Sequence, residues 1–155
     1  MRIVLAADHA AVGEKAALYE DLKAAGHEVT DLGPFDAESV DYPDYAAPAA
    51  RAVAAGEADR AVLLCGTGIG QCMTANKIPG ARAAVLWNDA SAEMSRRHND
   101  ANVACFGARL QPMAEISRLL RLWLATPFDG GRHERRVGKM NALDAPRRAD
   151  AAPDA

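Results

Sequence analysis

The stretch that decides the fold is residues 61–71, AVLLCGTGIGQ, where an apolar run ends in a loop of alternating glycines. The run 61–64 has the length and branching of a strand that is covered on both faces. The three glycines allow the backbone to turn tightly and to present its N–H groups to a ligand. A helix is expected over 70–77, so the loop lies at a positive helix terminus. This environment suits an anion, or negative charge that develops during a reaction.

The composition is that of one ordinary globular domain. The chain has 155 residues, half of them hydrophobic, and a net charge of −3, which gives no indication of a nucleic-acid or membrane partner. Arginine supplies 14 of its 18 basic residues, which favours forked recognition of phosphate or carboxylate. Three cysteines without C-x-x-C spacing, no leader and no apolar stretch of about 20 residues predict a cytoplasmic protein with reduced thiols.

Strand and helix patterns alternate along the chain. This alternation predicts an α/β fold with a five-stranded parallel sheet and helices on both faces. Residues 1–143 are expected to form a single domain with a helical C-terminal part over 130–143, and 144–155 a disordered polar tail. The expected strands are 3–7, 27–32, 60–65, 81–87 and 103–106, and the other expected helices are 13–25, 45–55, 70–77, 90–100 and 111–125.

Ligands of such sheets bind beyond the carboxyl ends of the strands. Polar clusters are expected at or just beyond four of these ends, namely Asp8-His9, 65–70, Asn88-Asp89 and 107–109. The Asn88-Asp89 pair can also cap the following helix, and Asp8-His9 can merely cap the first one. The convergence at one edge follows from the fold prediction alone.

Cys65 is the leading catalytic candidate. A thiol beside loop amides at a helix N-terminus is biased toward thiolate, which is a usable base or nucleophile, and Thr67 adds a hydroxyl. The alternative is an inert cysteine at the buried end of a strand. The loop is a weak match to a dinucleotide fingerprint because its glycines are spaced G-x-G-x-G, and a P-loop is excluded because G-K-[ST] is missing.

A second group of candidates lies in the last third of the chain. His98, flanked by Asn99 and Asp100 at an expected helix end, is a candidate acid or base, although a lone helical histidine is usually a surface or core residue. Arg132 and Arg136 share a helix face and suit a phosphate, or simply form a solvated surface. No recognised metal-ligand spacing is present.

A set of motifs extends over nearly the whole chain, to about residue 143. Each motif is weak alone, but together they are specific, and through them the chain resembles the ribose-5-phosphate isomerase B family, which also includes galactose-6-phosphate isomerase subunits. The motifs are Ala7-Asp8-His9, Asp41-Tyr42-Pro43, Leu64-Cys65-Gly66-Thr67-Gly68-Ile69-Gly70, Ala75-Asn76-Lys77, Arg97-His98-Asn99-Asp100-Ala101-Asn102, Phe106-Gly107-Ala108-Arg109, and Gly130-Gly131-Arg132-His133 with Arg136.

The resemblance implies a Rossmann-like three-layer α/β/α sandwich. It also implies a homodimer, or a tetramer, with sites shared across the interface, and no metal or organic cofactor. The implied reaction interconverts ribose 5-phosphate and ribulose 5-phosphate, with Cys65 as the base and His98 opening the sugar ring. Asp8, Thr67 and Asn99 would act at the hydroxyls, the loop Gly66, Thr67, Gly68, Ile69 and Gly70 would hold the enediolate oxygen, and His9, Arg109, Arg132 and Arg136 would bind the phosphate.

Some details separate this chain from its relatives. Family members without the cysteine use a glutamate directly after the last loop glycine, whereas this chain has Cys65 and Gln71. Relatives that act on tetrose phosphates tend to lose the Asp-His pair and the His-Asn-Asp run, and this chain keeps both. Another aldose phosphate, such as allose 6-phosphate or a tetrose phosphate, and a non-catalytic sugar-phosphate or nucleotide-binding module remain the alternatives.

Overall fold

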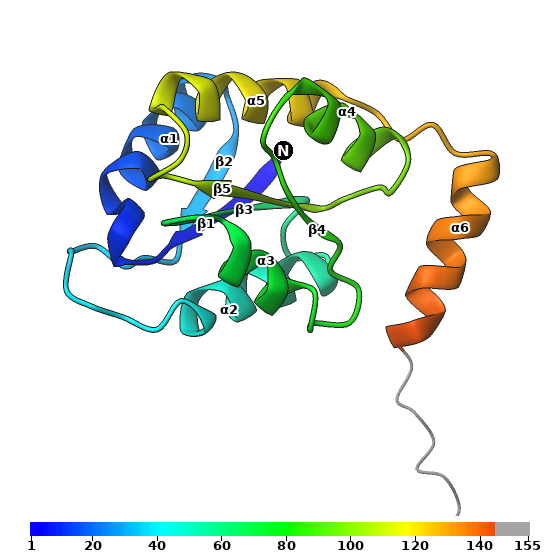
Figure 1. Cartoon of the computed structure of the whole chain (residues 1–155), viewed down its shortest axis with the longest axis horizontal. Helices are drawn as coiled ribbons and strands as arrows, with labels where there is room; N and C mark the ends of the chain where they lie inside the picture. The colour runs from blue at the N-terminus through cyan, green and yellow to red at the C-terminus, as the bar shows by residue number, and fades with distance from the viewer. Residues whose placement is uncertain (145–155) are drawn as a thin grey trace, which may run out of the picture.

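The centre of the protein is a parallel sheet of five strands in the order β2-β1-β3-β5-β4 (Figure 1). The computed structural model describes residues 1–144, and the rest of the predicted disordered tail lies outside the described residues. The expected α/β fold is confirmed. The strands are β1 (Arg2–Ala7), β2 (Glu28–Asp31), β3 (Arg60–Cys65), β4 (Ala83–Val85) and β5 (Val103–Gly107).

Helices cover both faces of the sheet. Helices α1, α4 and α5 lie on one face, and α2 and α3 lie on the other, as Figure 1 shows. The chain leaves β1 through α1 on one face and enters β3 through α2 on the other, so β1 and β3 flank the point where the connections change face. The helical segments are η1 (His9–Ala11), α1 (Val12–Ala24), α2 (Pro43–Ala54), α3 (Ile69–Ala75), α4 (Asp89–Arg97), α5 (Met113–Ala125), α6 (Arg132–Asn141) and η2 (Ala142–Asp144).

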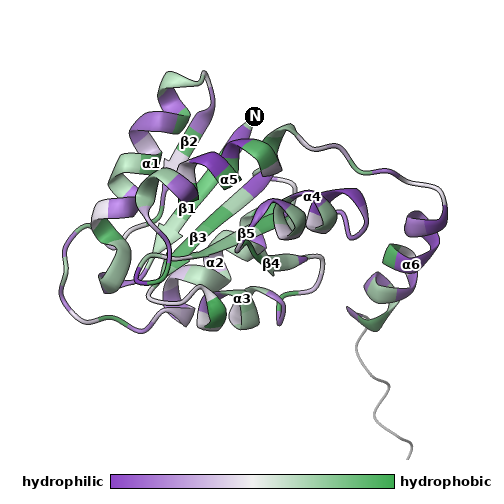
Figure 2. Cartoon of the chain, turned by 45° about the horizontal axis from the view of Figure 1, so that its top comes forward, coloured by the Kyte–Doolittle hydropathy of each residue, from purple (hydrophilic) through white to green (hydrophobic). Residues whose placement is uncertain are grey.

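The core consists of two layers, one on each side of the central strands. Alternate residues of β3 enter opposite layers, since Leu64 packs with the α1 and α5 side and Leu63 with the α2 side. Residues 61–65 are all buried, which explains why this strand reads as an uninterrupted apolar run. Figure 2 shows the hydrophobic residues concentrated along β1 and β3 and the hydrophilic ones on the outer sides of the helices.

The edge strand β4 is shorter than the sequence pattern suggested. Residues 81–87 were expected to form it, but only Ala83–Val85 do. The side chain of Asn76 accepts the Ala83 N–H at 2.8 Å and donates to the Ala83 carbonyl oxygen at 2.9 Å. This amide occupies backbone groups that an edge strand would otherwise leave open to another strand. Beyond the strand, Leu86 turns into the core while Trp87 is exposed.

Helix α6 confirms the helix expected within 130–143. It stands apart from the sheet, beside the end of α4 (Figure 1). Its second residue, His133, and Val137, one turn later, are its buried side chains. The described structure extends through Asp144, one residue beyond the expected domain boundary, and the Asp144 carboxylate accepts the N–H of Gly80 at 2.8 Å. No helix within residues 1–144 has the length and apolar character to cross a lipid bilayer.

Gly107 offers a test of how tightly β5 holds the glycine loop. A Cβ at this position would lie 2.8 Å from the backbone carbonyl carbon of Thr67, so the loop backbone would have to move. We expect Gly107→Ala to lower the free energy of unfolding by about 1–3 kcal/mol. Gly138 in α6 has no atom within 4 Å of the corresponding position, so Gly138→Ala is the matched control and should not destabilise the protein. Urea unfolding would measure both, and equal stabilities would contradict the close contact.

Candidate active site

The carboxyl ends of β1, β3 and β5 are joined by backbone hydrogen bonds that continue beyond the strands. The N–H of Asp8 donates to the Leu64 carbonyl oxygen at 3.0 Å. On the other side of β3, the N–H of Ala108 donates to the carbonyl oxygen of Cys65 at 2.8 Å. The N–H of Arg109 donates to the carbonyl oxygen of Gly66 at 3.1 Å. Three chain segments that are far apart in the sequence therefore leave the sheet side by side.

A cleft of about 250 Å³ lies over these three strand ends. It lies where β1 and β3 adjoin, which is the switch point at which open parallel sheets bind their ligands. Most residues that the sequence singled out around the loop therefore meet at one site. The lining residues are Asp8, His9, Ala10, Tyr42, Cys65, Gly66, Thr67, Gly70 and Arg109.

The sulfur of Cys65 lies at the wall of this cleft and accepts a backbone hydrogen bond. The N–H of Gly68 donates to Cys65 Sγ at 3.0 Å, and the side chain of Cys65 is only 5% exposed. Gly68 has φ +78°, and a Cβ there would lie 3.0 Å from the carbonyl carbon of Phe106, so the turn requires glycine. Gly68 and Ile69 do not line the cleft; the side chain of Ile69 is half exposed.

Asp8 and His9 are held at the cleft by different contacts. The Asp8 carboxylate accepts the N–H of Ala10 at 2.9 Å, so the capping role that the sequence left open is real and coexists with a position in the cleft. His9 Nδ1 faces the N–H of Val40 at 3.3 Å. Because a backbone N–H can only donate, neutral His9 carries its proton on Nε2, which leaves that nitrogen as a donor.

The loop that brings Val40 to His9 is anchored at its start. Asp31, at the end of β2, accepts the N–H of Gly33 at 2.8 Å. The same carboxylate pairs with Lys15, whose side chain is only 2% exposed in α1 and also lies over the ring of Phe35. A buried lysine without this partner would be strongly unfavourable, so the ion pair holds the first residues of the loop against the body.

Arg109 brings positive charge to the cleft. Its Cδ lies 3.3 Å from the position that a Cβ on Gly66 would occupy, so the arginine side chain lies along the glycine loop. With His9 as an N–H donor on the neighbouring strand end, the cleft has the charge and donors that a phosphate requires.

The remaining predicted residues lie elsewhere in the chain. His98 is the C-terminal cap of α4, with Asn99 next to it, and Arg132 and Arg136 belong to α6. Cys65 ends β3 at the carboxyl edge of the sheet, whereas His98 lies just before the start of β5 at the opposite edge. Six residues of β3 separate the two edges by about 16 Å. Within a single chain, the two groups of residues therefore form separate sites.

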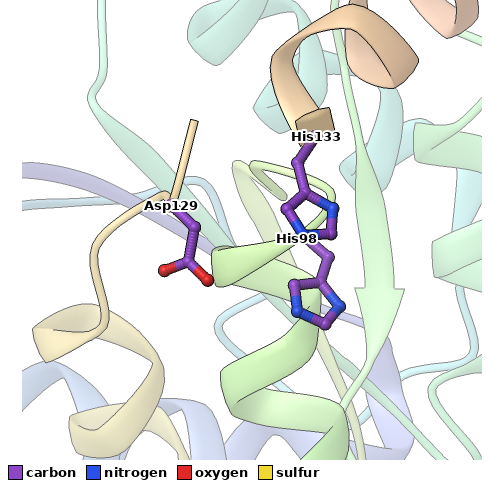
Figure 3. Close-up of side chains that lie close together, drawn as sticks. All are labelled: His98, Asp129 and His133. Atoms are coloured by element: carbon purple, nitrogen blue, oxygen red, sulfur yellow. The ribbon is translucent and has the colours of Figure 1, made fainter. Parts of the chain in front are cut away.

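His98 forms a cluster with His133 and Asp129 (Figure 3). The two imidazole rings are stacked, with centroids 4.1 Å apart and 5° between their planes. Burial lowers the pKa of His133, and the nearby charges of His98, Arg132 and Arg136 lower it further, while Asp129 acts in the opposite direction. His133 is therefore favoured in its neutral form.

Two histidines and a carboxylate are residue types that bind metal ions, and in this cluster one ligand atom from each of the three side chains lies within 4.8 Å of the other two. Its geometry does not fit an ion well. Parallel rings direct their in-plane lone pairs along parallel lines instead of at a common point. Asp129 is paired with Arg97 at 3.2 Å, and Arg132 Nε lies 3.3 Å from His133 Nε2. That no metal takes part in the reaction stays a prediction.

Other hollows in the described part of the chain have a different character. One of about 330 Å³ between α1 and α5 is lined mainly by apolar side chains such as Leu18, Leu22 and Leu120. Another of about 530 Å³ lies between the body and the end of α6 and includes Asn99 and Arg82. Both are larger than the cleft at Cys65, but neither contains a nucleophile beside a backbone donor, so the chemistry favours the smaller cleft.

Two residues that shape the cleft were not among the candidates from the sequence, and one predicted polar cluster lies outside the cleft. Tyr42 lines the cleft, with its ring against Gly70, and only the motif Asp41-Tyr42-Pro43 pointed to it. The backbone contact from Val40 to His9 had no sequence signal. The Asn88-Asp89 pair does not line the cleft: Asn88 caps α4 in a capping box, as the alternative interpretation had it, and Asp89 pairs with Arg118.

The model of the ribose/galactose isomerase family matches residues 3–140 of the chain. The chain belongs to this family. Ribose-5-phosphate isomerase B of Escherichia coli is 40% identical over 143 residues, which cover 92% of this chain and 96% of that protein. The ribose-5-phosphate isomerase B of Mycobacterium tuberculosis is 35% identical, covering 100% of this chain and 97% of the relative.

Solved structures agree with this assignment. The structure of Clostridium thermocellum ribose-5-phosphate isomerase B has a TM-score of 0.91 and 44% identity, covering 93% of this chain and 97% of that one. The Mycoplasma genitalium ribose-5-phosphate isomerase B, solved with bound ribulose-5-phosphate, has a TM-score of 0.88 and 38% identity, covering 92% and 95%. The resemblance seen in the motifs and the expected aldose–ketose isomerase activity are confirmed at the level of the family.

The contact between Val40 and His9 can be tested by histidine NMR. Val40→Pro removes the N–H that His9 Nδ1 accepts, so the neutral imidazole should change from the Nε2–H tautomer toward a mixture. Long-range ¹H–¹⁵N spectra distinguish the tautomers, and the chain has only four histidines to assign. Val40→Ala keeps the N–H and is the control. An unchanged tautomer in Val40→Pro would show that another contact orients His9.

Proposed function

We propose that the protein interconverts ribose 5-phosphate and ribulose 5-phosphate through an enediolate, with Cys65 as the base. The observation that carries the proposal is the position of the Cys65 sulfur, at the wall of a cleft that also contains His9 and Arg109. Relatives named ribose-5-phosphate isomerase B support the choice of substrate. Allose 6-phosphate and tetrose phosphates remain alternatives that an assay over several sugar phosphates would separate.

The reaction needs one mobile proton and an anion site. Cys65 takes the proton from C2 of the open aldose, and the electrons of the C–H bond form the C1–C2 double bond while the carbonyl oxygen at C1 becomes negative. Cys65 then returns the proton to C1, the proton of the C2 hydroxyl is transferred to the negative oxygen at C1, and C2 becomes the carbonyl carbon of the ketose. The redox change is internal, so no redox cofactor is required. Donors fixed around the loop would stabilise the developing oxyanion best because they need no reorganisation.

The phosphate provides remote binding energy. A phosphate held between the Nε2–H of His9 and Arg109 would align C1 and C2 with Cys65, and this alignment can account for much of the rate enhancement. Asp8 is buried next to these groups, and its carboxylate could accept a sugar hydroxyl with the lone pairs not used by Ala10. Thr67 could serve a second hydroxyl.

A second copy of the chain would complete the site. We propose that His98 opens the furanose ring. In a single copy of the chain, the edge of the sheet that carries Cys65 and the edge where His98 lies are separated by the length of β3, about 16 Å, and Arg132 and Arg136 belong to the separate helix α6. Exposed apolar side chains around the carboxyl edge of the sheet support an interface there: Tyr42, Ile69, Met73, Trp87 and Leu110. Burial of such a patch favours association of two copies.

The base can be tested by removing its sulfur. Cys65→Ala should reduce kcat for ribose 5-phosphate by several orders of magnitude while the fold persists, because the remaining groups provide orientation but no base. Cys72→Ala is the matched control, since Cys72 is a half-buried thiol on α3 that does not line the cleft. A coupled assay for ribulose 5-phosphate, with circular dichroism to verify folding, would measure both. Near-normal turnover of Cys65→Ala would disprove the cysteine mechanism.

Sharing of the site between two copies predicts complementation. Cys65→Ala and His98→Asn remove groups that would belong to the same site but come from different protomers. A mixed dimer would contain one site with both defects and one intact site. Unfolding and refolding an equal mixture should therefore restore about a quarter of the wild-type activity, because half of the dimers are mixed. No gain over the separate variants would show that each protomer carries a complete site.

A further inference from the structure

His133 makes the closest aromatic contact of His98, yet it is neither at the cleft nor among the residues given a role above. The two rings are stacked, with 4.1 Å between centroids and 5° between planes (Figure 3). His98 comes from the end of α4, and His133 from the first turn of α6, 35 residues later. The His133 side chain is only 7% exposed, whereas most side chains of α6 are open to solvent.

The contacts of His133 determine its protonation. Arg132 Nε lies 3.3 Å from His133 Nε2, and a guanidinium can only donate, so this nitrogen is the acceptor and Nδ1 carries the proton. The charged or titratable groups around the ring are His98 on α4, Arg132 and Arg136 on α6, and Asp129 before α6. Burial, His98 and the two arginines lower the pKa of His133, and Asp129 opposes them only in part, so the neutral imidazole is favoured and its face can lie on His98 without charge repulsion.

Helix α6 has few other connections to the body. The Asp129 N–H donates to the Arg97 carbonyl oxygen at 3.0 Å, and the Arg97 side chain pairs with the Asp129 carboxylate. At the far end, Arg82 reaches Asn141 at 3.5 Å. Between these points, His133 is one of two buried side chains of the helix. The stack is therefore a principal contact that sets how α6 lies against α4.

We propose that His133 is a positioning residue: by stacking on His98, it fixes the plane of that ring and the placement of α6, with Arg132 and Arg136, relative to it. The inference rests on the proposed function, in which His98 opens the sugar ring and the two arginines bind phosphate. A ring that rotates about its own bond would present its nitrogens in many directions. A neutral, flat neighbour removes this freedom without adding charge to the reacting site.

The kinetic test separates stacking from hydrogen bonding. We expect His133→Ala to reduce kcat for ribose 5-phosphate roughly 10- to 100-fold, because the acid or base loses its orientation. His133→Phe keeps a flat ring but no nitrogen, so kcat should return to within about threefold of wild type. KM should be raised in both variants, since Arg132 loses its acceptor in each. His27→Ala, at the distant β2 edge, is the control and should change neither constant.

A double-mutant cycle distinguishes positioning from a general structural effect. When His98 is already Asn, the further change His133→Ala should leave kcat almost unaltered, because there is no imidazole left to orient. A second decrease of the same size as in the wild-type background would overturn the proposal. The same holds if His133→Phe is as impaired in kcat as His133→Ala.

A spectroscopic measurement tests the stack without turnover. Ring protons of stacked histidines shield one another, so the His98 signals should move downfield in His133→Ala and stay near their wild-type positions in His27→Ala. Burial and the neighbouring positive groups lower the pKa of His133, so acidification that protonates this ring should loosen the stack. Unchanged His98 signals would overturn the proposal. If the wild-type protein does not isomerise ribose 5-phosphate, the proposed function fails, but this measurement still reports on the contact.

Discussion

The parallel pairing of β3 between β1 and β5 is the constraint on which the site depends. The register pairs Ala7 with Leu64 and Cys65 with Gly107, so the three strands end at the same level. Hydrogen bonds just beyond the strands then hold the following residues together. The cleft contains residues from positions 8 to 109 because a parallel sheet gathers its carboxyl ends at one edge. A slip of one residue would turn Cys65 to the opposite face of the sheet.

A second constraint is that a single chain cannot bring all candidate residues to this edge. Helix α4 runs back along the sheet, so its end, with His98, is carried to the amino edge before β5 begins. Helix α6 is attached beside that end through Arg97, Asp129 and the histidine stack. The same topology that assembles the cleft thus separates it from His98, and this separation is the physical argument for a site completed by another copy.

The sequence predicted the succession of strands and helices along the chain well, but not the ends of every element. The buried run of β3 and the apolar face of α5 were recognised because periodicity reports burial directly. The pattern of 81–87 gave too long a strand, because Leu86 is buried just beyond the end of β4 and periodicity does not distinguish a core residue in a strand from one that directly follows it. The backbone donor of Val40 had no side-chain signature at all.

From the sequence alone came the fold class, the family resemblance and most of the residues that line the cleft, because strand patterns and the order of polar clusters are local properties. Only the tertiary structure decided that Asn88 is a cap, that Tyr42 lines the cleft, and that His98 lies with His133 instead of Cys65. These outcomes depend on which helix end reaches which edge of the sheet. Such long-range placement results from packing the whole chain and leaves no trace in the spacing of residues.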